Sequence, residues 1–186
     1  MAGKGSWFFE GYKGVIETDD DGTKGKRKLI YTGEYYGFRG GRQELILMKK
    51  VCLGLTLLSL IAFFYAHFFP STGGMVHWLA IPSLLALVPV IFMIMGLINF
   101  LPSKDKWEIR VYYAGYRRIL RWSYIYLVLD LIWLIMEIIF IILHSSMVAD
   151  ELRFALAILA SVVAISVQIR LMREHEAMVV EGPKIK

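Results

Sequence analysis

The sequence predicts an all-α membrane protein with four transmembrane helices, arranged as two antiparallel helical hairpins, and a small cytoplasmic β-hairpin or sheet formed by the N-terminus. Two observations support this fold class. The chain has 186 residues, of which 57% are hydrophobic, and its mean hydropathy of +0.55 is more apolar than that of a soluble domain of this size. The apolar residues also form four separate stretches, each long enough to cross a bilayer as one helix. The predicted spans are residues 45–69, 78–101, 122–144 and 152–171.

Residues 1–44 are expected to lie outside the membrane, because they are polar and aromatic and contain no long apolar run. Residues 7–16 and 26–36 have the composition of strands, and the turn-forming residues 18–25 between them predict a β-hairpin. An isolated hairpin is marginally stable in water, so it needs a surface to pack on. The alternating residues 107–113 predict a further strand, which could join the hairpin in a three-stranded sheet.

The first two predicted spans carry local features of membrane helices. Lys49 and Lys50 lie near the start of the first span, and their long side chains can reach the membrane surface while their stems stay in apolar surroundings. Pro82 and Pro89 lie seven residues apart in the second span. Because a proline removes a backbone hydrogen bond inside a helix, the second span is expected to be kinked.

The distribution of Lys and Arg predicts the orientation of the chain. The first 50 residues contain ten, residues 102–121 contain six, and the residues from 170 onward contain four. The connections at 70–77 and 145–151 contain none. Basic residues favour the cytoplasmic side of a membrane. We therefore expect a multi-pass protein of the cell membrane with both termini, the 102–121 loop and the tail at 172–186 in the cytoplasm.

The third predicted span carries two carboxylates, Asp130 and Glu137, which are seven residues apart. Seven residues are close to two helical turns, so both side chains project from one face, together with Tyr126 and Trp133. A charged carboxylate at the bilayer centre costs roughly 2.5–3.5 kcal/mol. No Lys or Arg lies deep in any predicted span, so the chain supplies no obvious counter-charge for this acidic stripe.

Three interpretations of the two acids stay open. They are neutral packing groups that hydrogen-bond to neighbouring helices, they exchange protons or bind a cation, or they pair with a basic residue of a partner subunit. Polar residues on one face of the fourth span, Ser161 and Gln168, are the candidates to hydrogen-bond either acid. The predicted set for proton or ion exchange, or for partner pairing, is Asp130, Glu137, Tyr126, Trp133, Ser161 and Gln168.

Basic residues lie at the cytoplasmic ends of the predicted spans, where anionic lipid headgroups attract Lys and Arg. Residues 37–42 are rich in glycine and arginine but lack the Gly-Lys-Ser/Thr sequence of a phosphate loop. We therefore expect contacts with membrane lipids, and the residues predicted to meet headgroups are Arg39, Arg42, Lys49, Lys50, Arg117, Arg118 and Arg121.

The sequence contains no motif for catalysis or for a cofactor. Its single cysteine, Cys52, excludes an intrachain disulfide and a cysteine-based zinc cluster. The four histidines have no metal-ligand spacing, and no Ser-His-Asp arrangement or dinucleotide fingerprint occurs. We therefore expect no catalytic residue, no cofactor and no metal site. The net charge of +5 is explained by membrane orientation, so no nucleic-acid partner is expected.

Three functions are compatible with these features. The one we expect is a non-enzymatic accessory or scaffolding subunit of a larger, transporter-type membrane assembly, whose partner is another membrane subunit or a second copy of the chain. The alternative is a small proton- or cation-coupled transporter that uses Asp130 and Glu137. A membrane-embedded lipid-modifying enzyme ranks last, because both carboxylates are predicted to lie too deep to reach headgroups.

Overall fold

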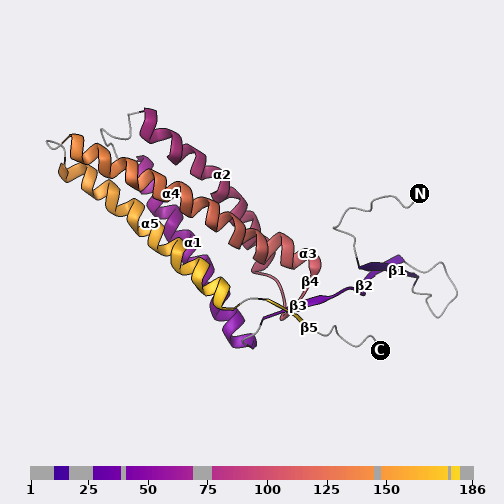
Figure 1. The fold of residues 1–186 in the computed structure, drawn as a ribbon. Helices are drawn as coiled ribbons and strands as arrows, with labels where there is room; N and C mark the ends of the chain where they lie inside the picture. The colour runs from indigo at the N-terminus through magenta and orange to yellow at the C-terminus, as the bar shows by residue number, and fades with distance from the viewer. Residues whose placement is uncertain are drawn as a thin grey trace.

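A computed structural model describes residues 11–16, 27–38, 41–68, 77–144, 148–175 and 177–180, without the side chains of 15, 16, 27–30, 77–79 and 148–150. The predicted turn at 18–25 and Arg39 lie outside these ranges. Within them, four helical segments are each long and apolar enough to cross a membrane (Figure 1). The long helices are α1 (Arg42–Phe68), α2 (His77–Phe100), α4 (Arg118–Leu143) and α5 (Val148–Glu174), and α4 continues a short α3 (Ile109–Val111) and a π-helical turn η3 (Tyr112–Arg117).

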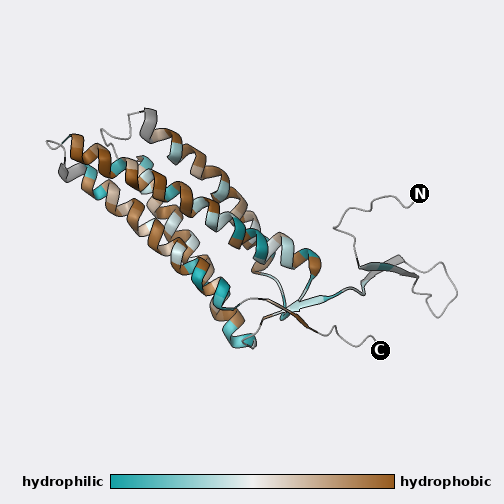
Figure 2. Cartoon of the chain, viewed as in Figure 1, coloured by the Kyte–Doolittle hydropathy of each residue, from teal (hydrophilic) through white to brown (hydrophobic). Residues whose placement is uncertain are grey.

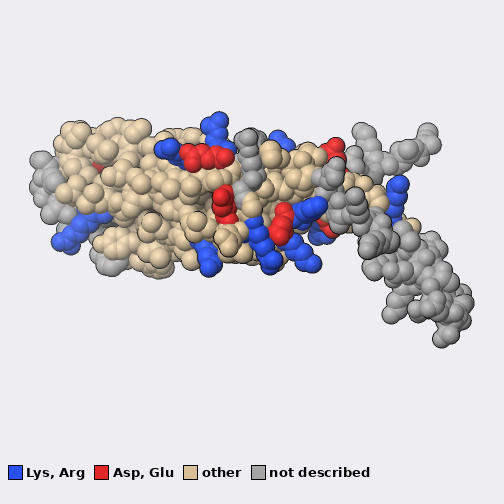
Figure 3. All heavy atoms as spheres, turned by 90° about the horizontal axis from the view of Figure 1, so that it is seen from below, with Lys and Arg blue, Asp and Glu red and all other residues tan. Residues whose placement is uncertain are grey.

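The four long helices expose apolar side chains and bury polar ones. Ile61, Ile98 and Ile142 are among the exposed large hydrophobic residues, whereas Asp130 and Glu137 are buried. Figure 2 shows hydrophobic residues along most of the helix length, and Figure 3 shows that most Lys and Arg side chains on the face in view lie in the half nearer the strands. This distribution is compatible with a multi-pass membrane protein, because lipid favours apolar helix surfaces and disfavours exposed charge.

The helices do not pack in the order of the chain. α4 packs against α2 on one side and against α5 on the other, and α5 packs in turn against α1. α1 and α2 are consecutive and antiparallel (Figure 1), yet few of their residues meet. Of the two predicted hairpins, α4 and α5 therefore pack as a pair, whereas α1 and α2 each pack chiefly on another helix.

The close approach of η3 to the end of α2 explains an error in the predicted elements. We predicted a strand at 107–113 inside a loop at 102–121, but only β4 (Lys106–Glu108) is extended, and helix begins directly after it. The helix brings Gly115 against Phe100, so that a Cβ on this glycine would lie 3.2 Å from the Phe100 Cα atom. This tertiary packing outweighs the alternating sequence pattern, which is a weak local preference.

Three short strands form an antiparallel sheet at one end of the bundle. β3 (Tyr35–Gly37) lies in the middle, between β4 and β5 (Met178–Val180). Tyr36 of β3 is paired with a residue of each neighbouring strand. The sheet therefore holds the N-terminal segment, the connection between α2 and α3, and the segment after α5 at the same end of the bundle. A strand at β5 was not predicted from the sequence.

The predicted N-terminal β-hairpin is present, although its second strand is shorter than predicted. β1 (Tyr12–Ile16) pairs with β2 (Arg27–Tyr31) in an antiparallel two-stranded sheet. After β2 the chain bends, and the Tyr31 hydroxyl donates a hydrogen bond of 2.7 Å to the backbone carbonyl of Glu34. The single strand predicted at 26–36 is therefore two strands in two different sheets.

An aromatic cluster joins the three-stranded sheet to the helices. Trp107 of β4 is 1% exposed. Its ring centroid lies 5.2 Å from that of Phe100 and 5.7 Å from that of Tyr116. The Tyr116 hydroxyl donates a hydrogen bond to the backbone carbonyl of Met172 in the last turns of α5. These contacts fix the positions of α2, η3 and α5 relative to one another at the sheet end.

Candidate functional site

The acidic stripe predicted from the sequence lies inside the bundle. Buried residues of α4 recur every three or four positions, which is the spacing of a single helix face. Its polar members are almost completely enclosed: Asp130 is 1% exposed, and Tyr126 and Glu137 are 0% exposed. Because this face packs on α5 of the same chain, the stripe does not belong to the outer surface of the bundle.

Asp130 lies at the end of a short chain of hydrogen bonds. The Ser161 hydroxyl of α5 donates to Oδ2 of Asp130 over 2.6 Å, and the Tyr126 hydroxyl lies 3.0 Å from the same Ser161 oxygen. A serine hydroxyl has a single proton to donate. Tyr126 therefore donates to Ser161, which donates to Asp130, and both hydroxyl protons point toward the carboxylate. The other oxygen of Asp130 has no hydrogen-bond partner among the described residues.

A second buried polar group lies nearer the sheet end. The Thr56 hydroxyl of α1 donates a hydrogen bond of 3.0 Å to Oε1 of Gln168. The amide nitrogen of Gln168 donates in turn to the hydroxyl of Ser123, at 3.3 Å. Ser123 precedes Asp130 by two helical turns, or about 10 Å along α4. Gln168 therefore joins α1, α5 and α4, and it does not hydrogen-bond either acid of the stripe.

Glu137 lies two turns beyond Asp130, toward the opposite end of the bundle. Its side chain is 0% exposed, and among the described residues no hydroxyl, amide or amine group donates a hydrogen bond to its carboxyl oxygens. The group that acts on it is a second carboxyl, that of Glu151 in the first turn of α5, which is 1% exposed. Among the described ion pairs, none involves Glu137 or Asp130. Two acids therefore face each other in apolar surroundings.

Trp133 lies on the same face of α4 as the two acids, between Asp130 and Glu137 along the helix. It is 3% exposed, and its ring centroid lies 5.5 Å from that of Phe154, 6.2 Å from that of Phe63 and 5.4 Å from the His67 ring. These aromatic contacts come from both α1 and α5, so the indole is packed on two sides. The Asp130 group and the Glu137 group are therefore separated by an apolar aromatic layer.

Together these groups form a polar column that follows the axis of the bundle. Its three levels are the Gln168 group, the Asp130 group and the Glu137–Glu151 pair, spaced about 10 Å apart along α4. Carboxyl groups at two of the levels can take up or release a proton, and hydroxyl groups at the other positions can relay one. Buried ionisable groups of this kind in apolar helices are functional candidates by default.

Sequence reasoning placed most of this column but missed one acid. Asp130, Glu137, Tyr126 and Trp133 share the α4 face as predicted from their spacing. Glu151 was assigned to the connection at 145–151, although α5 already begins at Val148. The signal that was overlooked is its spacing, because Glu151 stands seven, ten and seventeen residues before Ile158, Ser161 and Gln168, all on the buried face of α5.

Lys49 occupies a different position from the lipid contact that we predicted. It is 8% exposed, and its ammonium group donates hydrogen bonds to the backbone carbonyls of Leu101, at 3.2 Å, and of Ser103. These carbonyls belong to the segment that follows α2. Lys49 therefore joins α1 to this segment, while the neighbouring Lys50 remains exposed.

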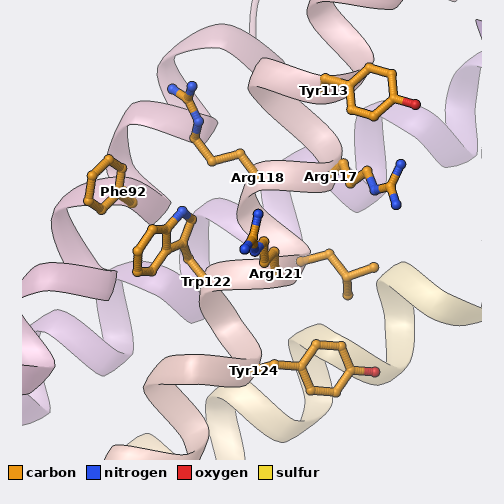
Figure 4. A pocket seen from close by; sticks show the side chains of 8 residues that line it. Phe92, Tyr113, Arg117, Arg118, Arg121, Trp122 and Tyr124 are labelled. Atoms are coloured by element: carbon orange, nitrogen blue, oxygen red, sulfur yellow. The ribbon is translucent and has the colours of Figure 1, made fainter.

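The other predicted headgroup residues that the structure describes lie at the same end of the molecule as Lys49. Arg42, at the start of α1, lies 4.0 Å from Asp105 through Nε, and both side chains are largely exposed. Arg117, Arg118 and Arg121 line an open cavity of about 770 Å³ around the start of α4, which Phe92 of α2 also lines (Figure 4). The structure therefore brings three of the predicted basic residues together in one cavity.

No protein-family model, curated protein or solved structure matches this chain. Within the described ranges, no group of three His, Cys, Asp or Glu side chains is placed to hold a metal ion. Any function therefore has to be argued from the polar column and its surroundings.

Proposed function

We propose that the protein is a small proton-coupled membrane transporter in which Asp130 and Glu137 take up and release protons inside the bundle. The observation that carries this proposal is the Glu137 carboxyl, which is fully buried and interacts with a second carboxyl, that of Glu151. The inward orientation of the stripe favours this function over the accessory subunit that we expected, because acids enclosed by their own chain offer nothing to a partner.

The chemistry of the Glu137–Glu151 pair supports proton exchange. Two carboxyl groups that meet in apolar surroundings do not both carry a charge, because desolvation and mutual repulsion both disfavour it. At least one of the two therefore holds a proton in the closed bundle. The pair lies close to the end of α4, six residues before Leu143, so a small opening there would let water remove that proton.

Asp130 forms the second proton site of the proposed transporter. The hydroxyl groups of Ser161 and Tyr126 point their protons toward it, which prepares the site for the charged carboxylate. Transfer between Asp130 and Glu137 covers about 10 Å, which is too far for one direct step. In the proposed cycle Trp133 moves aside, and water connects the two acids and relays the proton. An organic cation, which suits the aromatic walls, is the expected transported substrate.

The orientation follows from the positions of the basic residues. The three-stranded sheet and most Lys and Arg side chains lie at one end of the bundle (Figures 1 and 3). Basic residues favour the cytoplasmic side, so we place this end, with both terminal segments, in the cytoplasm of the cell. The Glu137–Glu151 pair then opens toward the outside of the cell membrane, and the Gln168 group lies on the cytoplasmic side of Asp130.

The test is proton flux into liposomes that contain the purified protein and a trapped pH-sensitive dye. Asp130→Asn and Glu137→Gln keep the size of each side chain but remove the group that ionises, so both variants are expected to lose pH-driven flux down to the leak of empty liposomes. Glu44→Gln is the matched control, because Glu44 lies in the first turn of α1 and is exposed. It should leave the flux unchanged.

Two outcomes would contradict the proposal. Unchanged flux in both Asp130→Asn and Glu137→Gln would remove these acids from proton transfer. Flux that falls equally in Glu44→Gln would show that the loss comes from reconstitution and not from the column.

The accessory subunit remains the second candidate function, and one observation favours it. The β1–β2 hairpin lies beyond the bundle at the sheet end (Figure 1), where it offers strand edges to a partner. Purification in mild detergent tests this candidate. A single monomer without a co-purifying protein and without self-association would count against it.

A further inference from the structure

We infer that the cavity between α2 and the start of α4 binds the phosphate group of an anionic membrane lipid. This inference goes beyond the proposed proton transport and does not depend on it. The cavity has a volume of about 770 Å³ and is lined by three arginines and by aromatic residues of α2, η3 and α4. Figure 4 shows the residues that carry the argument, Phe92, Tyr113, Arg117, Arg118, Arg121 and Trp122.

The three arginines provide a concentrated positive charge. Arg117 and Arg121 are one helical turn apart, and so are Arg118 and Arg121, which makes all three neighbours on the helix surface. None of them takes part in an ion pair among the described residues, in contrast to Arg42 and Arg170. Like charges at this spacing repel each other. An anion bound between them would relieve that repulsion and could accept hydrogen bonds from several guanidinium groups.

The aromatic residues form the apolar part of the cavity. The rings of Phe92 and Trp122 are stacked, with centroids 4.3 Å apart and planes at 8°. Arg117 lies over the Tyr113 ring, 5.1 Å from its centroid. Figure 4 shows the Arg118 side chain extending on the same side as Phe92 and Trp122, and the Arg117 side chain extending on the side of Tyr113. Each side of the cavity therefore combines a guanidinium group with aromatic rings, so a phosphate and the apolar part of an amphiphile can be bound next to each other.

The depth of the cavity favours a lipid over a soluble phosphate compound. The 22 helical steps from Arg121 to Leu143 correspond to about 33 Å, which matches the roughly 30 Å hydrocarbon core of a bilayer. Arg121 therefore lies at the level of the headgroups if Leu143 lies at the opposite boundary. Just deeper than the cavity, Ile91 and Val128 are 54% and 56% exposed. A phosphate at the arginines would thus leave its acyl chains along an apolar helix surface.

The test measures lipid binding by native mass spectrometry of the purified protein in detergent, titrated with phosphatidylglycerol or with phosphatidylcholine of the same acyl chains. Wild-type protein is expected to bind phosphatidylglycerol more tightly than phosphatidylcholine. The double variant Arg118→Ala/Arg121→Ala is expected to bind phosphatidylglycerol roughly thirtyfold more weakly, since each arginine near a membrane surface is worth about a factor of five. Its binding of phosphatidylcholine should not change.

The matched control is Arg170→Ala/Arg173→Ala, which removes two arginines at the same helical spacing from α5, where both side chains are exposed at the same end of the bundle. It should keep its affinity for phosphatidylglycerol within about twofold, because exposed charges far from the cavity are screened by salt and contribute little to binding of the lipid. If the first double variant does not fold, Arg121→Gln alone should weaken binding of this lipid about fivefold.

Three results would overturn the inference. Equal binding of the two lipids by wild-type protein would show that the cavity does not select a negative charge. An equal loss in the α5 control would show that net charge, and not the cavity, attracts the lipid. Displacement of phosphatidylglycerol by an excess of inorganic phosphate, with retention of phosphate by the protein, would assign the site to a soluble anion.

Discussion

The Ser161 hydroxyl donates a hydrogen bond of 2.6 Å to Oδ2 of Asp130, which joins α5 to α4 in the interior of the bundle. Ser161 is 2% exposed and Asp130 is 1% exposed, so neither group has water as an alternative partner. Tyr126 reaches the same serine oxygen. The three side chains therefore form one connected unit, and removing its middle member should affect both neighbours.

Ser161→Ala is accordingly expected to lower the free energy of unfolding by about 1 kcal/mol, the typical value for one hydrogen bond between membrane helices. Ser161→Thr keeps the hydroxyl group and is the control that should retain most of this stability. Unfolding in mixed detergent micelles, followed by loss of helical circular dichroism, measures the difference. Equal stability of the alanine variant and the wild type would show that the hydrogen bond between Ser161 and Asp130 does not stabilise the bundle.

Glu137→Leu is expected to have the opposite effect. The substitution replaces a buried carboxyl that meets another carboxyl by an apolar group of similar size. It should therefore raise the free energy of unfolding by about 1–2 kcal/mol while abolishing proton flux. The same unfolding assay and the liposome assay measure the two effects. A variant that loses stability and flux together would indicate that Glu137 has a structural role.

Gly96 and Gly54 should respond in opposite ways to substitution by alanine. A Cβ on Gly96 would lie 2.7 Å from Cγ1 of Ile119 and 3.2 Å from its backbone nitrogen, whereas nothing lies within 4 Å of a Cβ on Gly54. Gly96→Ala should therefore cost about 2 kcal/mol of stability through overpacking between α2 and α4. Gly54→Ala should add about 0.5–1 kcal/mol, because alanine favours the helix.

The unfolding assay distinguishes these outcomes, and Gly96→Ala combined with Ile119→Ala provides a further check. Alanine removes the Cγ1 atom of residue 119, so the double variant should lose less stability than the sum of the two single variants if the clash with Ile119 is the cause. Additive losses in the double variant would point to a different origin of the effect.

Lys49 and Lys50 are adjacent lysines with different expected contributions. Lys49 donates hydrogen bonds to two carbonyls beyond the end of α2, so Lys49→Met should reduce the free energy of unfolding by about 2 kcal/mol. Lys50 is exposed, and Lys50→Met should change the free energy of unfolding by less than about 0.5 kcal/mol. Thermal unfolding of both variants in the same detergent gives the comparison. A similar loss in both would show that the hydrogen bonds of Lys49 to the segment after α2 do not stabilise the fold.

The contact between Tyr12 of β1 and Glu108 of β4 should depend on pH. The Tyr12 hydroxyl donates a hydrogen bond to the Glu108 carboxylate, and burial, followed by this hydrogen bond and the carboxylate charge, raises the pKa of Tyr12 from 10.0 to about 12. A raised pKa means that folding favours the protonated hydroxyl. The stabilisation is therefore complete below pH 10 and is lost as the pH rises toward 12.

Tyrosinate absorbance measures this titration as the difference between wild-type protein and Tyr12→Phe. Glu108→Gln keeps an acceptor for the hydrogen bond but removes the negative charge, so it should lower the midpoint of the Tyr12 titration toward 10, the ordinary value. A midpoint that does not move would show that Glu108 does not control the ionisation of Tyr12.

The parts of the fold that depend on hydropathy and on local sequence pattern could be predicted from the sequence. The four apolar stretches correspond to four helices that are long and apolar enough to span a membrane, since burial in lipid requires such runs whatever the tertiary contacts are. The shared face of Asp130 and Glu137 followed from helical periodicity alone. The hairpin of β1 and β2 followed from turn residues between two strand-like segments.

The remaining features depend on contacts between distant segments, which a single sequence does not encode in readable form. The alternation at 107–113 predicted a strand, but packing of Gly115 on Phe100 made most of it helical. Gln168 was expected to bond an acid, yet Thr56 and Ser123 lie closer to it. The pairing of Glu137 with Glu151 requires the register of α4 on α5, which only the three-dimensional structure supplies.

The sheet of β4, β3 and β5 has a consequence for the order in which the molecule is completed during synthesis. β3 emerges from the ribosome before any of the long helices, but its partner strand β5 follows α5. Until residues 178–180 are made, one edge of β3 stays open to other strands. The sheet can therefore close only after every long helix has been synthesised, and a chain truncated before β5 should be more prone to misassembly and to removal by proteases.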